Sequence, residues 1–216
     1  MKFTFDLFHG DESPADDFTG WIPKWWYRSK GLPLEKGVLP SGDEWLLAGW
    51  FLSGESPSEI VSRFRSTGIE TLFKADGQFI LALYSKSDDC LEVFRDWAGI
   101  LPLVYGQGTG TIGISTWIDH VVEFVKAKPS ASPALLRQYP VYRLTFVPDT
   151  PLREIQTLSG RYSLRIRGHR VEAVEHPITV SKGKQYRSLG EASRELGENL
   201  SRSVRQRLKY CKNLGA

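Results

Sequence analysis

The side chains that could act as covalent nucleophiles are few in this sequence. It contains two cysteines, Cys90 and Cys211, far apart along the chain. A thiolate is a strong nucleophile and a metal ligand, but neither cysteine belongs to a Cys-x-x-Cys pair. The sequence also lacks the Gly-x-Ser-x-Gly elbow of serine hydrolases. We therefore expect both cysteines to be ordinary thiols, outside any zinc site or disulfide framework.

Patterns that bind metals or phosphates are weak as well. The sequence contains four histidines that share no ligand spacing: His9, His120, His169 and His176. No metal site is therefore predicted. The glycines of residues 106–110 lie between two predicted strands, with no helix start to hold a phosphate, and they indicate a hairpin turn. Leu158-Ser159-Gly160 is similar to the pyrophosphate loop of ATP-using synthetases, but the residues after it predict a hairpin instead of a helix.

The elements that would position such residues are predicted from apolar periodicity and turn residues. Alternating apolar residues predict a strand at residues 1–10, and an aromatic run predicts another at residues 21–27. Glycines and prolines predict a loop at residues 29–42, before an apolar strand at residues 44–53. Ser56-Pro57-Ser58-Glu59 has the pattern of a capping box and starts a helix.

The stretch from residue 72 onward predicts an antiparallel meander that organises the rest of the chain. Four strands are expected in sequence order, at residues 79–84, 91–94, 100–105 and 111–116. Turn-forming residues separate them. The remaining elements must cover the apolar face of this sheet, which is α+β layering.

Helices and a hairpin are predicted downstream of the meander. Residues 118–127 carry valines at helical spacing, and residues 133–139 predict a short helix that ends before Pro140. Residues 161–175 predict a hairpin around Gly168.

A long C-terminal helix is predicted after a polar connector. Ser188 and Glu191 form its capping box, and the helical pattern continues to about Tyr210. Its apolar stripe consists of Leu189, Ala192, Leu196, Leu200, Val204 and Leu208. Such a stripe should not stay exposed, so we expect it to meet a further domain, a separate subunit or a second copy of the chain.

The overall composition is that of an ordinary globular chain. Of 216 residues, 41% are hydrophobic and 25% are charged, and the net charge of +3 is too small to indicate nucleic-acid binding. No apolar run reaches the length of a membrane helix, and the first residues lack a signal-peptide pattern, so we expect a cytoplasmic protein without membrane contact. Seven tryptophans indicate either an aromatic core or a contact surface.

Six motifs follow one another along the chain in a specific order and spacing. They are Asp76-Gly77-Gln78-Phe79, Ala82-Leu83-Tyr84, Arg95-Asp96-x-x-Gly99-Ile100-x-Pro102-Leu103, Tyr105-Gly106, Thr150-Pro151-Leu152-Arg153-Glu154-Ile155 and Leu158-Ser159-Gly160-Arg161-Tyr162. Together they resemble the glutaminase-type domain of asparagine synthases, over roughly residues 40–210. The resemblance implies a four-layer αββα sandwich of the N-terminal-nucleophile type. It also implies that Arg95 and Asp96 are a structural ion pair that fixes a turn.

The resemblance implies a definite set of catalytic groups as well. Such glutaminases use an N-terminal cysteine whose thiolate attacks the glutamine amide, while its own α-amine serves as the base. An Asn-Gly pair forms the oxyanion hole, an arginine holds the substrate carboxylate, and an aspartate holds the α-amino group. Where the family has Met-Cys, this chain has Met1-Lys2. A lysine amine, with a pKa of about 10.4, is a poor nucleophile at neutral pH.

The pair that forms the oxyanion hole is also altered. The family strand Val-Asn-Gly-Glu-Ile aligns with Leu47-Ala48-Gly49-Trp50-Phe51, so Gly49 retains a backbone N–H but Ala48 has no side-chain donor. The loss of one such donor typically costs about 10²–10³ in rate. No arginine aligns with the one that binds substrate, since Arg28 and Lys36 lie in an expected loop. We predict a degenerate glutaminase pocket, without a catalytic residue, at four positions: Lys2, Ala48, Gly49 and Trp50.

Residues 1–180 are therefore predicted to form a degenerate glutaminase-like domain, and residues 181–216 a connector and the start of a synthetase domain. The leading hypothesis is a non-catalytic scaffold in an asparagine-synthase-like, ATP-dependent amide-forming ligase, like the corresponding domains of β-lactam synthetases and lasso peptide cyclases. No cofactor is expected in this chain, and ATP and Mg²⁺ would bind only in a partner or missing ATP-pyrophosphatase-type synthetase domain. Two alternatives are a glutaminase rebuilt around Lys2, and an interaction subunit that docks a separate synthetase or forms a homodimer.

Overall fold

The computed structural model describes residues 3–126, 128–177 and 185–208. The chain divides into two units, residues 1–176 and 177–216, each of which is considered by itself. The boundary predicted from the sequence was residue 180, and the assignment of the second unit to a synthetase domain stays a prediction.

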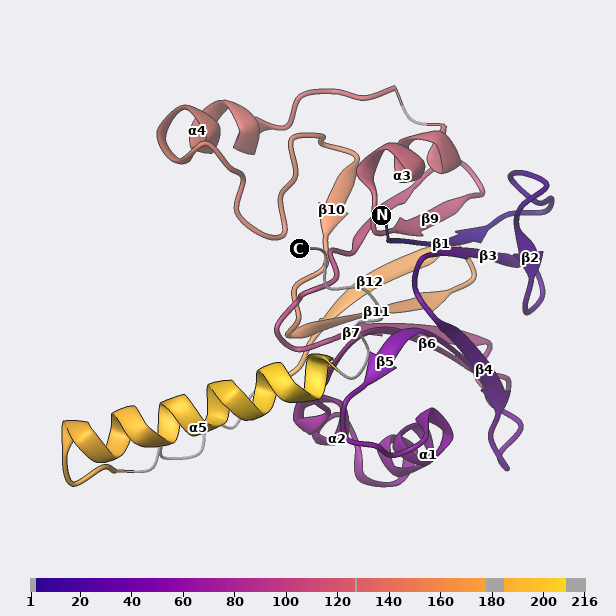
Figure 1. The fold of residues 1–216 in the computed structure, drawn as a ribbon. Coiled ribbons are helices and arrows are strands. Elements are labelled where there is room, and N and C mark those ends of the chain that lie inside the picture. Colours follow the sequence, from indigo (N-terminus) through magenta and orange to yellow (C-terminus); the bar gives the residue numbers. More distant parts are fainter. Residues whose placement is uncertain (1–2, 127, 178–184, 209–216) are drawn as a thin grey trace. The chain divides into compact units, whose positions relative to one another are not determined.

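Two antiparallel six-stranded sheets form the first unit (Figure 1). Sheet A consists of β1 (Thr4–His9), β2 (Thr19–Gly20), β3 (Trp25–Lys30), β8 (Val104–Gln107), β9 (Ile112–Ser115) and β10 (Ile155–Thr157), in the order β10-β8-β9-β1-β3-β2. Sheet B consists of β4 (Leu34–Val38), β5 (Glu44–Phe51), β6 (Gly77–Ser85), β7 (Cys90–Arg95), β11 (Tyr162–Arg167) and β12 (Arg170–Glu175), in the order β12-β11-β7-β6-β5-β4. Successive side chains of each strand point to opposite faces, so each sheet presents two surfaces that must be covered.

The inner faces of both sheets share one apolar core. Phe5 and Leu7 of β1 are completely buried in it, together with Leu46 and Ala48 of β5 and Ile80 of β6. Alternate residues of the same strands point the other way, toward the helices. Each sheet is therefore buried on both faces, which explains the nearly continuous apolar runs in β5 and β6.

Helices cover the two outer faces. The helices α1 (Pro57–Thr67) and α2 (Glu70–Lys74) pack on sheet B, where Ile60 and Phe64 join a second apolar core with Leu47 and Phe79. The helix α3 (Ile118–Val125) packs on sheet A through Val121 and its neighbours (Figure 1). The α+β class is confirmed, and the layers follow the order helix, sheet, sheet, helix.

The predicted capping box of α1 is confirmed. The Ser56 hydroxyl accepts a hydrogen bond from the Glu59 backbone N–H at 3.3 Å, and the Glu59 carboxylate accepts one from the Ser56 N–H at 2.8 Å. Pro57 occupies the first turn, where its missing N–H has no cost. These contacts satisfy backbone groups that the helix cannot satisfy internally.

The predicted four-stranded meander is wrong, because the chain changes sheets in its middle. β6 and β7 belong to sheet B, whereas β8 and β9 belong to sheet A. The Asp96 carboxylate accepts hydrogen bonds from the backbone N–H groups of Ile100 and Leu101, at 2.9 and 3.3 Å. This turn directs residues 100–103 out of sheet B, so β8 begins at Val104 and not at residue 100.

Arg95 fixes the same turn from the other side. Its guanidinium donates to the carbonyl of Leu158 at 2.6 Å and to the carbonyl of Gly99. The expected structural role is therefore present, but both residues act on backbone groups, and no ion pair joins Arg95 to Asp96 in the described part of the chain.

Two further predictions need correction, and two short elements were not predicted. Residues 29–42 are not all loop, because β4 pairs with β5; Gly37 leaves room for the Trp45 ring, which a Cβ would meet at 2.7 Å. The helix α4 (Pro133–Tyr142) continues past Pro140, which removes one hydrogen bond near the helix end without stopping it. The short α2 and β10 were not predicted at all, because five and three residues are too few for a periodic signal.

The second unit contains one described helix, α5 (Leu189–Leu208). The Ser188 hydroxyl accepts a hydrogen bond from the Glu191 N–H at 3.1 Å, which is one half of the predicted capping box. The Glu191 carboxylate accepts its hydrogen bond from the Arg187 N–H at 3.0 Å instead of from Ser188. The predicted helix end at Tyr210 and most of the predicted connector, residues 179–186, lie outside the described residues. Among those that are described, no helix combines the length and apolarity needed to cross a membrane.

Candidate functional site

The predicted pocket residues lie at the end of β5, apart from Lys2, which is outside the described residues. Ala48 is completely buried in the core between the sheets, and Trp50 packs against that core on the same face. Gly49 lies between them with a φ of +113°, in the region that favours glycine. A Cβ there would lie 2.0 Å from the Gln78 carbonyl oxygen, so the close approach of β6 by itself requires glycine.

The backbone N–H of Gly49 is already used in the fold. It donates a hydrogen bond of 2.8 Å to the carbonyl of Pro33, which extends the pairing of β4 with β5. An oxyanion hole needs donors aimed at the reacting oxygen. Here the methyl group of Ala48 offers no donor, and the N–H of Gly49 points at another strand. In the described structure, the Gly49 N–H is thus engaged by Pro33, and Ala48 supplies no side-chain donor.

Cys90 lies on the wrong face to act on a substrate beside Ala48. Its neighbours Leu91 and Val93 belong to the core between the sheets, so Cys90 points to the outer face of sheet B. There it lines a cleft together with Arg65 of α1 and Arg165 of β11. Burial raises the pKa of the Cys90 thiol, so little thiolate forms at neutral pH. Cys211 lies outside the described residues.

Arg28 and Lys36 lie in strands, not in a loop. Arg28 belongs to β3 and forms ion pairs with Asp6 at 2.8 Å and with Asp17 at 3.0 Å. Lys36 belongs to β4, and its amine lies 5.8 Å from the centroid of the Tyr27 ring. Arg28 is thus committed to two carboxylates, which leaves it unsuited to hold a substrate carboxylate.

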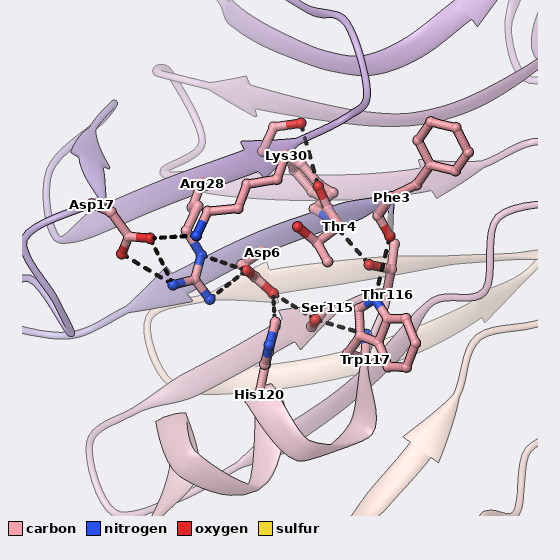
Figure 2. A network of polar contacts seen from close by, with 12 residues as sticks. Phe3, Thr4, Asp6, Asp17, Arg28, Lys30, Ser115, Thr116, Trp117 and His120 are labelled. Atoms are coloured by element: carbon pink, nitrogen blue, oxygen red, sulfur yellow. Dashed lines mark hydrogen bonds and ion pairs between the residues drawn. The ribbon is translucent and has the colours of Figure 1, made fainter. Parts of the chain in front are cut away.

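Asp6 is the centre of a polar network on the outer face of sheet A (Figure 2). Its side chain is completely buried, and it accepts hydrogen bonds from Arg28 at 2.8 Å and from Ser115 at 2.6 Å. His120 Nδ1 lies 2.8 Å from the same carboxylate. These residues come from β1, β3, β9 and α3, so one buried carboxylate ties four elements together.

The residue types in this network are those of a hydrolase triad, but their arrangement is not. In a triad the histidine bonds the serine with one nitrogen and the carboxylate with the other. Here Ser115 and His120 both contact Oδ1 of Asp6, and Ser115 is completely buried. The network, here called the Asp6 clamp, therefore holds these four elements together and does not activate Ser115 as a nucleophile. Sequence reasoning missed it because its members are up to 114 positions apart.

No group of three or more histidine, cysteine, aspartate or glutamate side chains in the described part of the chain could hold a metal ion.

Comparison with known families identifies the class. The model of the family described as "glutamine amidotransferase domain" matches residues 47–176, and the chain belongs to this family. The match begins at the β5 strand that carries Ala48 and Gly49, and ends with the β11–β12 hairpin and His176.

One similar solved structure is the glutamine phosphoribosylpyrophosphate (PRPP) amidotransferase from B. subtilis complexed with ADP and GMP. The two chains are 10% identical, with a TM-score of 0.47, and the match covers 82% of this chain and 44% of that one. This chain therefore spans less than half the length of that enzyme. No curated protein matches the chain.

Proposed function

We propose that this glutamine amidotransferase domain does not hydrolyse glutamine, and that it serves as a scaffold in an asparagine-synthase-like, ATP-dependent amide-forming ligase. One observation carries the first half of the proposal. The Gly49 N–H donates to Pro33 beside an alanine, at the position where the resembled glutaminases form their oxyanion hole. In this proposal the sandwich is of the N-terminal-nucleophile type, with its glutaminase chemistry lost.

The energetic consequence of these two changes is large. Removal of a single oxyanion donor costs about 10²–10³ in rate, because the developing negative charge then lacks a preorganised partner in a water-poor site. Ala48 removes the side-chain donor. Freeing the Gly49 N–H would require breaking its hydrogen bond to the carbonyl of Pro33, at about 0.5–1.5 kcal/mol.

The scaffold half of the proposal rests on the second unit. The side chains of Leu189, Leu196 and Leu200 form an apolar stripe on α5 and are 87%, 70% and 63% exposed. A stripe of this kind is stabilised when another surface covers it. We propose that this surface belongs to an ATP-pyrophosphatase-type synthetase, which would bind ATP and Mg²⁺ itself. The amine would come from the synthetase substrate or from free ammonia.

The test combines turnover with a covalent trap. The purified chain is incubated with glutamine, and glutamate and ammonia are measured against a known glutaminase of the same fold at equal concentration. We expect no release above the spontaneous rate. A reactive glutamine analogue should leave the intact mass of the chain unchanged. Enzymatic release of ammonia, or a stoichiometric adduct on Lys2 or a cysteine, would refute the proposal and favour a rebuilt glutaminase.

A further inference from the structure

An excursion of the chain at residues 130–154 carries α4 between α3 and β10. In Figure 1 this helix lies outside the two sheets and the helices that cover them. Backbone hydrogen bonds close the base of the excursion: the Ser132 N–H donates to the Pro151 carbonyl at 2.9 Å, and the Arg153 N–H donates to the Ser130 carbonyl at 3.0 Å. The residues between these bonds are therefore presented from a fixed base.

The outer part of the excursion is also held by specific contacts. The Ser132 hydroxyl caps α4, where it accepts a hydrogen bond from the Leu135 N–H at 3.0 Å. Beyond the helix, the Gln138 side chain accepts a hydrogen bond from the Phe146 N–H at 2.8 Å. The rings of Tyr142 and Phe146 pack together, with their centroids 5.0 Å apart. The chain after α4 is thus folded back onto the helix.

This excursion exposes a cluster of large apolar side chains, here called the α4 patch. Its members are each between 48% and 71% exposed: Leu136, Tyr139, Val141, Tyr142, Leu144, Phe146 and Val147. Single exposed apolar side chains are ordinary, but a cluster of them marks a surface that another molecule covers.

The charges within the α4 patch are all positive. Between residues 133 and 148 the charged side chains are Arg137 and Arg143, with neither a lysine nor an acidic residue. Both arginines are exposed, and neither forms an ion pair with a residue that the structure describes. A guanidinium binds a carboxylate through two parallel hydrogen bonds. The patch therefore complements an apolar surface with an acidic rim.

These features favour a protein partner over a membrane or a second copy of the chain. Tyrosine, phenylalanine and arginine are enriched in protein interfaces, where lysine is depleted. Anionic membranes attract clusters of about four to eight basic residues, and the patch has two. In a symmetric dimer the patch would meet itself and bring like charges together. The partner is therefore a different, acidic protein surface.

We propose that the α4 patch binds an apolar, acid-rimmed groove of the synthetase. This inference rests on the proposed scaffold function and extends it, because it assigns the synthetase a contact on the first unit in addition to α5. Aromatic and aliphatic side chains of the patch fill the centre of the groove, and carboxylates at its rim pair with Arg137 and Arg143.

The test is photochemical crosslinking from single positions of the chain, in the cells in which the protein occurs. The photoreactive amino acid p-benzoylphenylalanine replaces Tyr142 in the α4 patch and, separately, Leu196 on α5. Val38 provides the matched control, because it is the single exposed large apolar side chain of β4. Mass spectrometry identifies the crosslinked peptides. The purified products are assayed for ATP–pyrophosphate exchange, which a synthetase that forms an acyl-adenylate catalyses.

We expect the probe at Tyr142 to join a synthetase, in the same polypeptide or another, about tenfold more often than the probe at Val38 does. The proposal is overturned if the Tyr142 probe joins a lipid, a second copy of this domain or a protein without exchange activity, or if it yields no more product than the control. A synthetase joined to Leu196 but not to Tyr142 overturns this inference and leaves the proposed function in place. Failure at both positions contradicts both proposals.

A second measurement tests the acidic rim. Arg137→Glu should weaken binding of the purified synthetase about tenfold or more, because it places a carboxylate against other carboxylates. Residue 137 is exposed, so the thermal unfolding of this variant should match that of the wild type. Replacing the crosslinked acidic residue of the synthetase by arginine should restore binding to the variant. Wild-type affinity of folded Arg137→Glu, or a failure to restore binding, would overturn the proposal.

Discussion

The two ends of the sandwich differ in how their polar groups are satisfied. At the Gly49 end, the polar group is satisfied by the fold: the N–H of Gly49 is bonded to Pro33, and the neighbouring Ala48 is buried among apolar side chains. At the other end, His9 keeps a buried nitrogen without a partner beside His169 and an open cavity. The family match includes the residues of the first end. The second end is recognised only from a buried polar atom, His9 Nδ1, that has no hydrogen-bond partner among the described residues.

The strand β1 runs between these two ends. The largest loss of stability is expected when the Asp6 clamp, which holds this strand, is disrupted. In Asp6→Ala, the carboxylate that pairs with Arg28, Ser115 and His120 is lost from a completely buried position. Removing one partner of a buried ion pair costs about 3–5 kcal/mol, because the remaining charge stays desolvated. Urea unfolding should show a loss of this size.

The matched control for this loss is Asp17→Ala. Asp17 also pairs with Arg28, but its side chain is 43% exposed, so its removal should cost about 1 kcal/mol or less. Equal losses in the two variants would contradict the view that Asp6 holds β1 in place.

The next effect concerns Gly49 itself. Gly49→Ala adds a methyl group 2.0 Å from the Gln78 carbonyl, at a positive φ, and should destabilise the chain by about 3 kcal/mol or more. Gly54→Ala is the control, since Gly54 also has a positive φ of 78° but open space around its Cα. The difference between the two variants isolates the clash with β6. A similar, small loss in both would mean that β5 and β6 are less closely packed than described.

The smallest expected effect is a dependence of the free energy of unfolding on pH, which arises from His9 at the other end of the sandwich. The pKa of His9 is lowered by burial and by the charges of His169 and Lys24, against the opposite influence of Asp11 and Asp89. The unfolded chain therefore binds the proton more readily, and stability is greatest above the unfolded pKa of 6.5. As the pH falls below this value, the free energy of unfolding should decrease by up to about 1.4 kcal/mol per pH unit until His9 is protonated in the folded state.

His9→Gln should remove that part of the pH dependence. His176, whose pKa is also lowered chiefly by burial, will contribute in the same direction, so His176→Gln should remove a separate part. The measurement is urea unfolding of the three proteins at several pH values between neutral and acidic. An unchanged pH profile in His9→Gln would show that its imidazole is solvated in the folded chain.

Local patterns in the sequence predicted local structure well. The capping box at Ser56 forms as its side-chain chemistry requires, the Ser188 hydroxyl caps α5, and the hairpin turns at Gly168, where the predicted β11 and β12 pair. The change of sheet at Asp96 was not predictable from periodicity, because β6, β7, β8 and β9 all carry strand patterns, and the turn depends on hydrogen bonds to backbone groups.

The candidate site was predicted only in part. The resemblance placed Ala48 and Gly49 correctly on a strand, but a sequence does not show whether a backbone N–H is free, and the bond to Pro33 depends on β4, in a segment with loop composition. His9 and His169 gave no signal, because their contact joins residues 160 positions apart (169 − 9) through the packing of two sheets. Long-range contacts of this kind are set by topology and leave no local spacing.

The amide proton of Gly49 provides the most direct measurement of the central claim. With assigned backbone resonances, its hydrogen exchange can be compared with that of other residues of β5 in the free chain. The bond to Pro33 predicts that the Gly49 amide is as strongly protected as its neighbours in the strand, with or without added glutamine. Rapid exchange, or a shift of this resonance on addition of a glutamine-derived transition-state analogue, would show that the N–H is free to stabilise an oxyanion.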